Sequence, residues 1–248
     1  MLETILFVIL LLIVGVPIFI NIIGPFIVWK TQKVPAIVKF QALEDDEFLA
    51  NRNEKFKEYD QSLLRLGFFS VGSSLLKDSN TDSHFRLYWH NGIRVAAMVV
   101  TMQSKVEENT SLEITQKYTD GSFLGVSNSK TPEAYPKLDI KLSYRFPKII
   151  NSDELLKVHT RLKARYKSDL EPLDYDVSKG FHDVELFFKK ESDALFDIGV
   201  VKKEIDTEGK RSLTLQGAMA LTYRSIPPGK NIWAYITEKR AEAALKNA

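Results

Sequence analysis

The pattern of hydrophobic and polar positions changes sharply near residue 30. From Thr4 to Trp29 the chain carries no charged side chain and shows no polar face. As a helix this segment would be about 39 Å long at about 1.5 Å per residue, and a hydrocarbon core of about 30 Å needs about 20 apolar residues. We therefore expect a single-pass transmembrane anchor over residues 1–30, with length left for tilt or a kink.

Two other interpretations of this segment are weaker. A buried core helix normally keeps a polar face, which is missing here. A cleaved secretory signal has a basic start, a short apolar stretch and small residues at its cleavage site. The chain begins Met1-Leu2-Glu3 and its apolar stretch is long and ends at Trp29-Lys30. We therefore expect the anchor to be retained.

Flanking charges predict how the anchor is oriented. Lys30, Lys33 and Lys39 follow it, whereas only the α-amino group, beside Glu3, precedes it. The positive-inside rule then places the N-terminus outside and the folded part in the cytoplasm, although the acidic residues 44–47 dilute the bias. Trp29 and Lys30 would lie at the level of the lipid headgroups.

Three residues inside the apolar segment predict a helix partner. Pro17 and Pro25 each remove a backbone donor, and Asn21 lies between them. Prolines are tolerated in spans where neighbouring helices or polar groups satisfy the backbone again. Asn21, Pro17 and Pro25 therefore point to contact with another transmembrane subunit, or else Asn21 bonds its own backbone near Pro25. Without a GxxxG pair, a close homodimer has no specific support.

Residues 31–66 form the predicted juxtamembrane helical connector. Val34 precedes Pro35 and is therefore biased away from the helical region. Apolar residues then recur at intervals of three and four, which indicates one or two amphipathic helices ending at Gly67. These residues are Phe48, Leu49, Phe56, Tyr59, Leu63 and Leu66.

The next region predicts an antiparallel sheet. Asn91-Gly92 and Asp120-Gly121 each separate two strand-like runs, which is the strongest short-range hairpin signal because both turn residues are expected at φ > 0. Alternation at Leu138–Phe146 indicates one buried and one wet face. About six strands in meander order are expected, at Phe68–Leu75, Phe85–His90, Ile93–Gln103, Ser111–Thr119, Ser122–Asn128 and Leu138–Phe146.

Helices are expected to follow and to cover this sheet. Asn151 is a good N-cap, and the apolar spacing predicts helices from there, from about Val177 to Ile205 with a break at Gly209, and from Leu213 to Tyr223. Strong helix formers predict one more at the C-terminus. The expected fold is thus α+β: an N-terminal transmembrane helix, the connector, and a soluble domain over residues 67–248.

Composition and charge exclude several function classes. The 34 basic and 32 acidic residues give a net charge of +2, which is too small for a protein that wraps nucleic acid. With no cysteine, there is no disulfide framework, thiolate metal site or thiol nucleophile.

No motif assigns a catalytic residue, a metal or a cofactor. The four histidines (His84, His90, His159 and His182) lack the spacing of a zinc site, and His84 and His90 would lie at opposite ends of one strand. A phosphate-binding loop, a GxGxxG turn and a GxSxG elbow are all missing from the sequence. We expect no cofactor, and catalysis is the less favoured interpretation.

Aromatic and basic residues suggest a second contact with the membrane surface. Trp233 and Arg240, with Trp29, Lys30 and Lys33 beside the anchor, suit the level of anionic headgroups. The alternative is an ordinary solvated face.

The sequence therefore predicts a non-catalytic accessory, scaffold or tethering subunit of a membrane complex, whose partners are the lipid bilayer and other transmembrane subunits, and not nucleic acid. The alternative is a membrane-tethered ligand-binding domain or enzyme with a pocket on the sheet face. Its lining would be aromatic: Phe85, Trp89, Tyr118, Phe123 and Tyr144.

Overall fold

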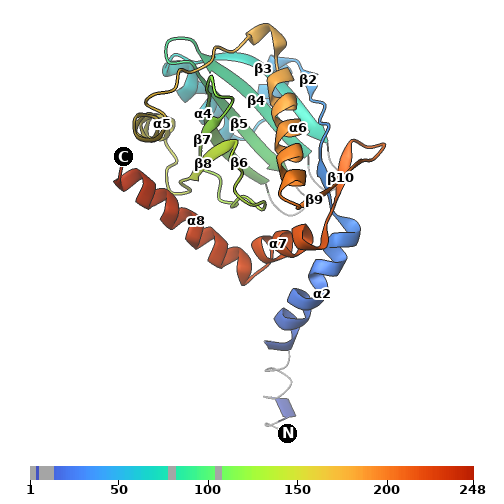
Figure 1. Cartoon of the computed structure of the whole chain (residues 1–248). Helices are drawn as coiled ribbons and strands as arrows, with labels where there is room; N and C mark the ends of the chain where they lie inside the picture. Colours follow the sequence, from blue (N-terminus) through green and yellow to red (C-terminus); the bar gives the residue numbers. More distant parts are fainter. Residues whose placement is uncertain (1–3, 6–13, 78–81, 104–107) are drawn as a thin grey trace. The chain divides into compact units, whose positions relative to one another are not determined.

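The computed structural model describes residues 4–5, 14–77, 82–103 and 108–248 of the chain (Figure 1). It confirms an α+β protein with a mostly antiparallel sheet. The described residues divide into two compact units. Unit 1 takes its described residues from Met1–Ile37, Pro132–Pro136 and Phe188–Ile236, and unit 2 takes them from Val38–Thr131, Lys137–Phe187 and Thr237–Ala248.

Unit 2 is built on a seven-stranded sheet in which neighbours along the chain are neighbours in space. Every adjacent pair is antiparallel except the last, β7 and β8, which is parallel. The strands are β2 (Gln41–Leu43), β3 (Phe69–Lys77), β4 (Asp82–His90), β5 (Val95–Gln103), β6 (Glu108–Lys117), β7 (Phe123–Ser127) and β8 (Lys141–Arg145).

The prediction of about six strands in meander order is right for β3 to β7 and wrong at both ends. Strand β2 was not predicted, because three residues are too few to show a period of two. Strand β8 was expected to turn back on β7, but residues 128–140 carry the chain across, so that β8 runs parallel to it.

Both predicted hairpins are confirmed, with turns of another type than expected. Loop 91–94 joins β4 to β5, and its left-handed residue is Arg94 (φ 53°) rather than Asn91 or Gly92. In the second hairpin Gly121 alone takes the positive φ, 76°, and its amide donates to the carbonyl of Tyr118.

Helices α3 (Asp45–Ala50), α4 (Glu54–Arg65) and α5 (Ser152–Tyr166) belong to the same unit. As predicted, α4 is amphipathic, and it buries Phe56, Tyr59 and Leu63 in the core of unit 2. It ends at Gly67 (φ 88°), after which the amide of Phe68 donates to the carbonyl of Leu63. The predicted cap of α5 is confirmed too, since the Asn151 side chain accepts from the amide of Asp153 at 2.8 Å.

The long helix predicted over Val177–Ile205 is corrected. A short 3₁₀ turn, η2 (Val177–Lys179), precedes α6 (His182–Asp197), and strand β9 (Val201–Ile205) follows. The break lies at Gly199 (φ 75°), ten residues before the predicted one at Gly209. The amide of Gly199 donates to the carbonyl of Phe196 and that of Val200 to the carbonyl of Leu195, which is a Schellman ending.

Unit 1 contains a small antiparallel sheet that the sequence did not predict. Its order is β1-β10-β9, with β10 (Lys210–Leu213) between β1 (Lys33–Pro35) and β9. Helix α7 (Leu215–Ser225) confirms the helix expected there, and α8 (Gly229–Lys246) confirms the C-terminal one. Helix α2 (Val16–Thr31) runs side by side with α7 (Figure 1).

Among the residues that the structure describes, no helix has both the length and the apolarity needed to cross a membrane. Helix α2 covers the second half of the predicted anchor over 16 residues. Residues 1–3 and 6–13 of that anchor lie outside the described residues.

Candidate functional site

Helix α2 leaves large apolar side chains exposed over much of its circumference. At about 100° per residue, the exposed positions extend more than half way round the helix. They include Ile18 (53% exposed), Phe19 (63%), Ile22 (59%), Phe26 (51%) and Ile27 (56%). A water-facing helix normally carries charged and polar residues on that side. This surface therefore indicates contact with an apolar environment that removes these side chains from water.

The remaining side of α2 contacts α7. A Cβ added to Gly24 would lie 3.2 Å from Cγ2 of Thr222 and 3.9 Å from Cδ1 of Ile226, so the two helices approach closely at this glycine. Small residues at such a crossing let helix backbones come together and gain van der Waals contact.

Pro17 and Pro25, which were predicted to mark a partner contact, lie at different positions in α2. Pro17 lies in the first turn of α2, where a backbone N–H has no intrahelical acceptor, so its absence breaks no hydrogen bond. Pro25 is inside the helix and buried. Pro25 has no N–H to give the carbonyl of Asn21, four residues earlier. The Tyr223 hydroxyl of α7 donates to that carbonyl at 3.4 Å. At the level of Asn21, the neighbouring helix in the structure is thus α7 of the same chain.

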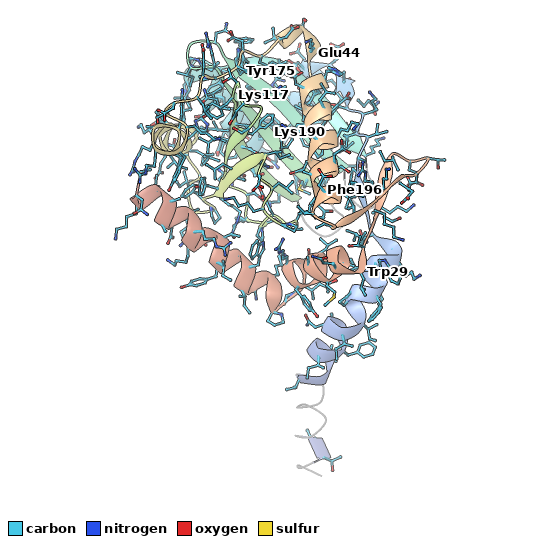
Figure 2. All side chains as sticks on the ribbon, viewed as in Figure 1. Trp29, Glu44, Lys117, Tyr175, Lys190 and Phe196 are labelled. Carbon is cyan, nitrogen blue, oxygen red and sulfur yellow. The ribbon has the colours of Figure 1, made fainter. Side chains whose placement is uncertain are left out.

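The predicted headgroup residues beside the anchor lie together at the C-terminal end of α2, where Figure 2 labels Trp29. The Lys30 ammonium lies 4.3 Å from the centre of the Trp29 ring. Lys33 pairs with Asp206 at 2.7 Å, and the hydrogen bond and charge of Asp206 raise the lysine's pKa. Lys30 and Lys33 are thus both exposed, but Lys33 is held in an ion pair.

The other two predicted surface residues lie in different units. Trp233, in unit 1, donates from Nε1 to the carbonyl of Glu133 at 2.8 Å, and the Arg224 guanidinium lies 4.3 Å from its ring centre. Arg240 is exposed on the part of α8 that belongs to unit 2.

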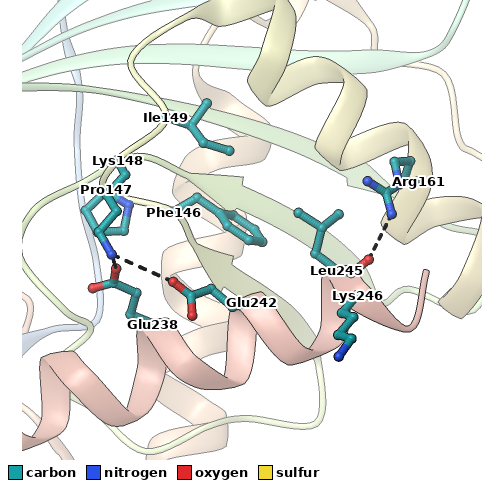
Figure 3. A pocket seen from close by; sticks show the side chains of 9 residues that line it. All are labelled: Phe146, Pro147, Lys148, Ile149, Arg161, Glu238, Glu242, Leu245 and Lys246. Carbon is teal, nitrogen blue, oxygen red and sulfur yellow. Dashed lines mark hydrogen bonds and ion pairs between the residues drawn. The ribbon is translucent and has the colours of Figure 1, made fainter.

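A shallow pocket of about 410 Å³ opens in unit 2 (Figure 3). Phe146, Ile149 and Leu245 give it an apolar wall. Its polar groups are paired with one another: Lys148 with Glu238 at 2.5 Å, and Arg161 with the carbonyl of Leu245 at 3.0 Å. This arrangement joins the end of β8 and α5 to the last turns of α8. None of the five aromatic residues expected to line a pocket on the sheet face borders it.

A buried polar cluster on β4 was not predicted from the sequence. Arg86 bonds through Nε to Asp60 at 3.1 Å and through Nη2 to Asp45 at 3.1 Å, and the Tyr88 hydroxyl donates to Asp60 at 2.7 Å. Arg86, Asp60 and Tyr88 are all buried. Burial and the Asp60 carboxylate raise the pKa of Tyr88, so its hydroxyl stays a donor. The cluster ties α3 and α4 to the sheet, and the signal for it is an arginine inside an apolar strand.

The histidines are dispersed as expected. Among the described residues, no group of three or more His, Asp or Glu side chains is placed to hold a metal ion. His84 and His90 lie at opposite ends of β4. His159 is buried under the sheet, where desolvation and the charge of Lys163 lower its pKa to about 4, so it is a neutral packing residue at pH 7.

These features define the class of protein as α+β, with an apolar helix pair in unit 1 and a sheet-based core in unit 2. Comparison of the chain with known protein families, with curated proteins and with solved structures found no match.

Proposed function

We propose that the protein is a single-pass, membrane-anchored accessory, scaffold or tethering subunit of a membrane complex, without catalytic activity. In this proposal α2 is the C-terminal half of the anchor, and unit 2 is held beside the bilayer. Its partners are the lipid and other transmembrane subunits.

The observation that carries the proposal is the exposed apolar surface of α2. Ile22 and Phe26 are more than half exposed, and the uncharged segment extends from Thr4 to Trp29. Moving half of one such side chain out of water is worth on the order of 1 kcal/mol, so the surface would favour lipid strongly in sum. A bilayer would cover all of the sides of this helix that α7 leaves exposed.

The charges at the end of α2 support a cytoplasmic location for the folded part, with the N-terminus outside. Lys30 and Lys33 lie directly after the apolar segment, and Lys39 follows. Because Lys33 is paired with Asp206 and Lys39 with Glu185, the bias rests mainly on Lys30.

The non-catalytic part of the proposal is supported by what the polar groups do. Within the core, Arg86 is ion-paired with Asp60, and Asp60 accepts from the Tyr88 hydroxyl. Lys148 and Glu238 pair at the edge of the pocket. Groups that are used in this way hold elements together and are not poised toward a substrate.

The partner contact is tested by extracting the full chain in a mild detergent and identifying by mass spectrometry the proteins that co-purify. We expect one or more membrane proteins at fixed stoichiometry, reduced by Asn21→Leu and unchanged by Ile22→Leu, a control on the exposed side of the same helix. A chain recovered alone, both as wild type and as Asn21→Leu, would contradict the proposal.

The alternative, a membrane-tethered ligand-binding domain or enzyme, is favoured by one observation, the pocket of about 410 Å³. It is tested on the full chain in detergent by thermal-shift measurements with metals, nucleotides and phospholipids. A ligand specific to the folded state raises the melting temperature. A rise that Arg161→Ala abolishes would favour this alternative, and no response would favour the accessory subunit.

A further inference from the structure

Helix α7 belongs to an unusually uncharged segment for this chain. Residues 213–229 read LTLQGAMALTYRSIPPG and contain one charged residue, Arg224, whereas 27% of the whole chain is charged. Like the apolar segment at residues 4–29, residues 213–229 thus lack, apart from Arg224, the charged side chains that a solvated helix normally carries.

The two faces of α7 are the reverse of those of a helix on a water-soluble surface. Its inner face consists of small residues: Gly217 lies directly against the Val200 backbone, where an added Cβ would come within 2.0 Å of the carbonyl oxygen. Its outer stripe is apolar, with Leu215, Met219 and Tyr223 at successive intervals of four residues and each 41–42% exposed. Large apolar residues exposed in such a row indicate a surface that contacts a partner or a membrane.

The contact with α2 fixes how deep α7 would lie. Gly24, which meets Thr222 and Ile226, is five residues before Trp29, or about 7.5 Å along the helix. Asn21, whose carbonyl accepts from Tyr223, is eight residues before Trp29, or about 12 Å. If Trp29 and Lys30 mark the headgroups, the C-terminal end of α7 is below them. Amphipathic helices at an interface bury their apolar face by about 5–10 Å, which includes the depth of Gly24, and Asn21 would lie slightly deeper.

The Tyr223 contact also supports a common depth for α7 and the C-terminal part of α2. Pro25 removes the intrahelical donor of the Asn21 carbonyl, and in hydrocarbon no water replaces it. A hydroxyl from a helix at the same depth does so, and that hydroxyl comes from α7.

We propose that α7 is a second membrane-embedded element, lying in the same leaflet as the C-terminal end of α2, with Leu215, Met219 and Tyr223 in contact with lipid. This inference rests on the proposed anchoring of α2. The occupant of the apolar stripe is the bilayer, because α7 packs directly against α2 in the same unit and both helices expose apolar side chains. Unit 1 would then be fixed in the membrane at two elements and could not rotate about a single helix.

The test uses the absence of native cysteine. Single-cysteine variants of the full chain at Met219 and at Leu215 are spin-labelled and reconstituted in vesicles of neutral and anionic phospholipid. Accessibility to oxygen, which concentrates in lipid, is compared with accessibility to a water-soluble nickel chelate. Ile22→Cys on α2 serves as the lipid reference, and Lys203→Cys, exposed on β9, serves as the water reference.

We expect the oxygen-to-nickel ratio at Met219 and Leu215 to exceed that at Lys203 by about tenfold or more, because a polar chelate is excluded from hydrocarbon. A water-like ratio at Met219 with a lipid-like ratio at Ile22 would overturn this inference and leave the anchor intact. A water-like ratio at Ile22 would overturn the anchor itself. Low accessibility to both reagents at Met219 would mean that protein, from a second copy or a partner, covers the stripe, and would also overturn the inference.

Discussion

At the scale of single residues, the structure separates polar groups that hold the fold from the groups that we propose face the membrane. Arg86 is buried in a strand and compensated by two carboxylates. Lys30 is exposed and Trp29 is partly buried at the end of an apolar helix. The first arrangement affects stability, and in our proposal the second affects where the chain resides.

Replacing Arg86 by methionine is expected to lower the free energy of unfolding by about 3 kcal/mol, because it leaves the buried Asp60 carboxylate without its cation. The change is measured on the full chain in detergent by urea titration, followed by tryptophan fluorescence, to which Trp89, next to the cluster along β4, contributes. Arg65→Met, on the exposed side of α4, is the matched control and should change stability by less than about 0.5 kcal/mol. Equal effects of the two substitutions would refute a structural role for the cluster.

His159 predicts a pH dependence. Its folded pKa, about 4, is below the ordinary value of 6.5, so the unfolded chain binds the proton more readily than the folded chain does. The stability is therefore full above pH 6.5 and falls as the pH drops toward 4, by about 2 kcal/mol between pH 7 and pH 5. Urea titrations at several pH values should show this loss in the wild type and a clearly smaller one in His159→Gln. The same slope in both proteins would contradict the assignment.

At the scale of elements, the helices and hairpins with a long, regular pattern could be predicted from the sequence. The short strands, which form only through pairing with other segments, could not. The 3.6-residue period located α4 and α5, and the Asn-Gly and Asp-Gly signals located the two hairpins. Strands β1, β2 and β10 have three or four residues and pair with distant segments, so no local period marks them. The early end of α6 depends on Gly199 adopting a positive φ, which spacing alone did not distinguish from Gly209.

The pairing of α2 and α7 can be tested by a disulfide. Since Cβ at position 24 would lie 3.2 Å from Cγ2 of Thr222, the double variant Gly24→Cys/Thr222→Cys meets the distance requirement of a disulfide. We expect it to form on mild oxidation of the full chain in membranes, seen as a mobility shift that a reductant reverses. Gly24→Cys/Leu215→Cys, with the second cysteine on the outer stripe, should remain reduced. Efficient cross-linking of that control, or none in the test pair, would contradict the packing.

At the scale of the whole molecule, the part of the candidate site that depends on composition could be predicted from the sequence. The part that depends on contacts between distant residues could not. The uncharged segment and its flanking lysines are read directly from the chain. The partner of Pro25 and Asn21 was expected in another subunit, and sequence could not show that Tyr223, two hundred residues later, approaches the same carbonyl. Whether another subunit also binds there remains the prediction tested by Asn21→Leu.

The orientation of the molecule gives a prediction of its own. With the N-terminus outside, Lys203→Cys should react with a membrane-impermeant maleimide in inside-out vesicles and remain unlabelled in sealed right-side-out vesicles until detergent is added. The lysines after α2 are the physical reason. Labelling in intact right-side-out vesicles would reverse the orientation without affecting the anchor.

The most direct test of membrane anchoring is alkaline carbonate extraction of membranes from cells that express the full chain, with the intact mass of the recovered protein determined by mass spectrometry. High pH releases proteins held by charge alone and leaves those whose helices are in hydrocarbon. We predict that the chain stays in the pellet with residues 1–30 still attached. Recovery in the supernatant, or as a shortened chain from which this segment has been removed, would contradict the account.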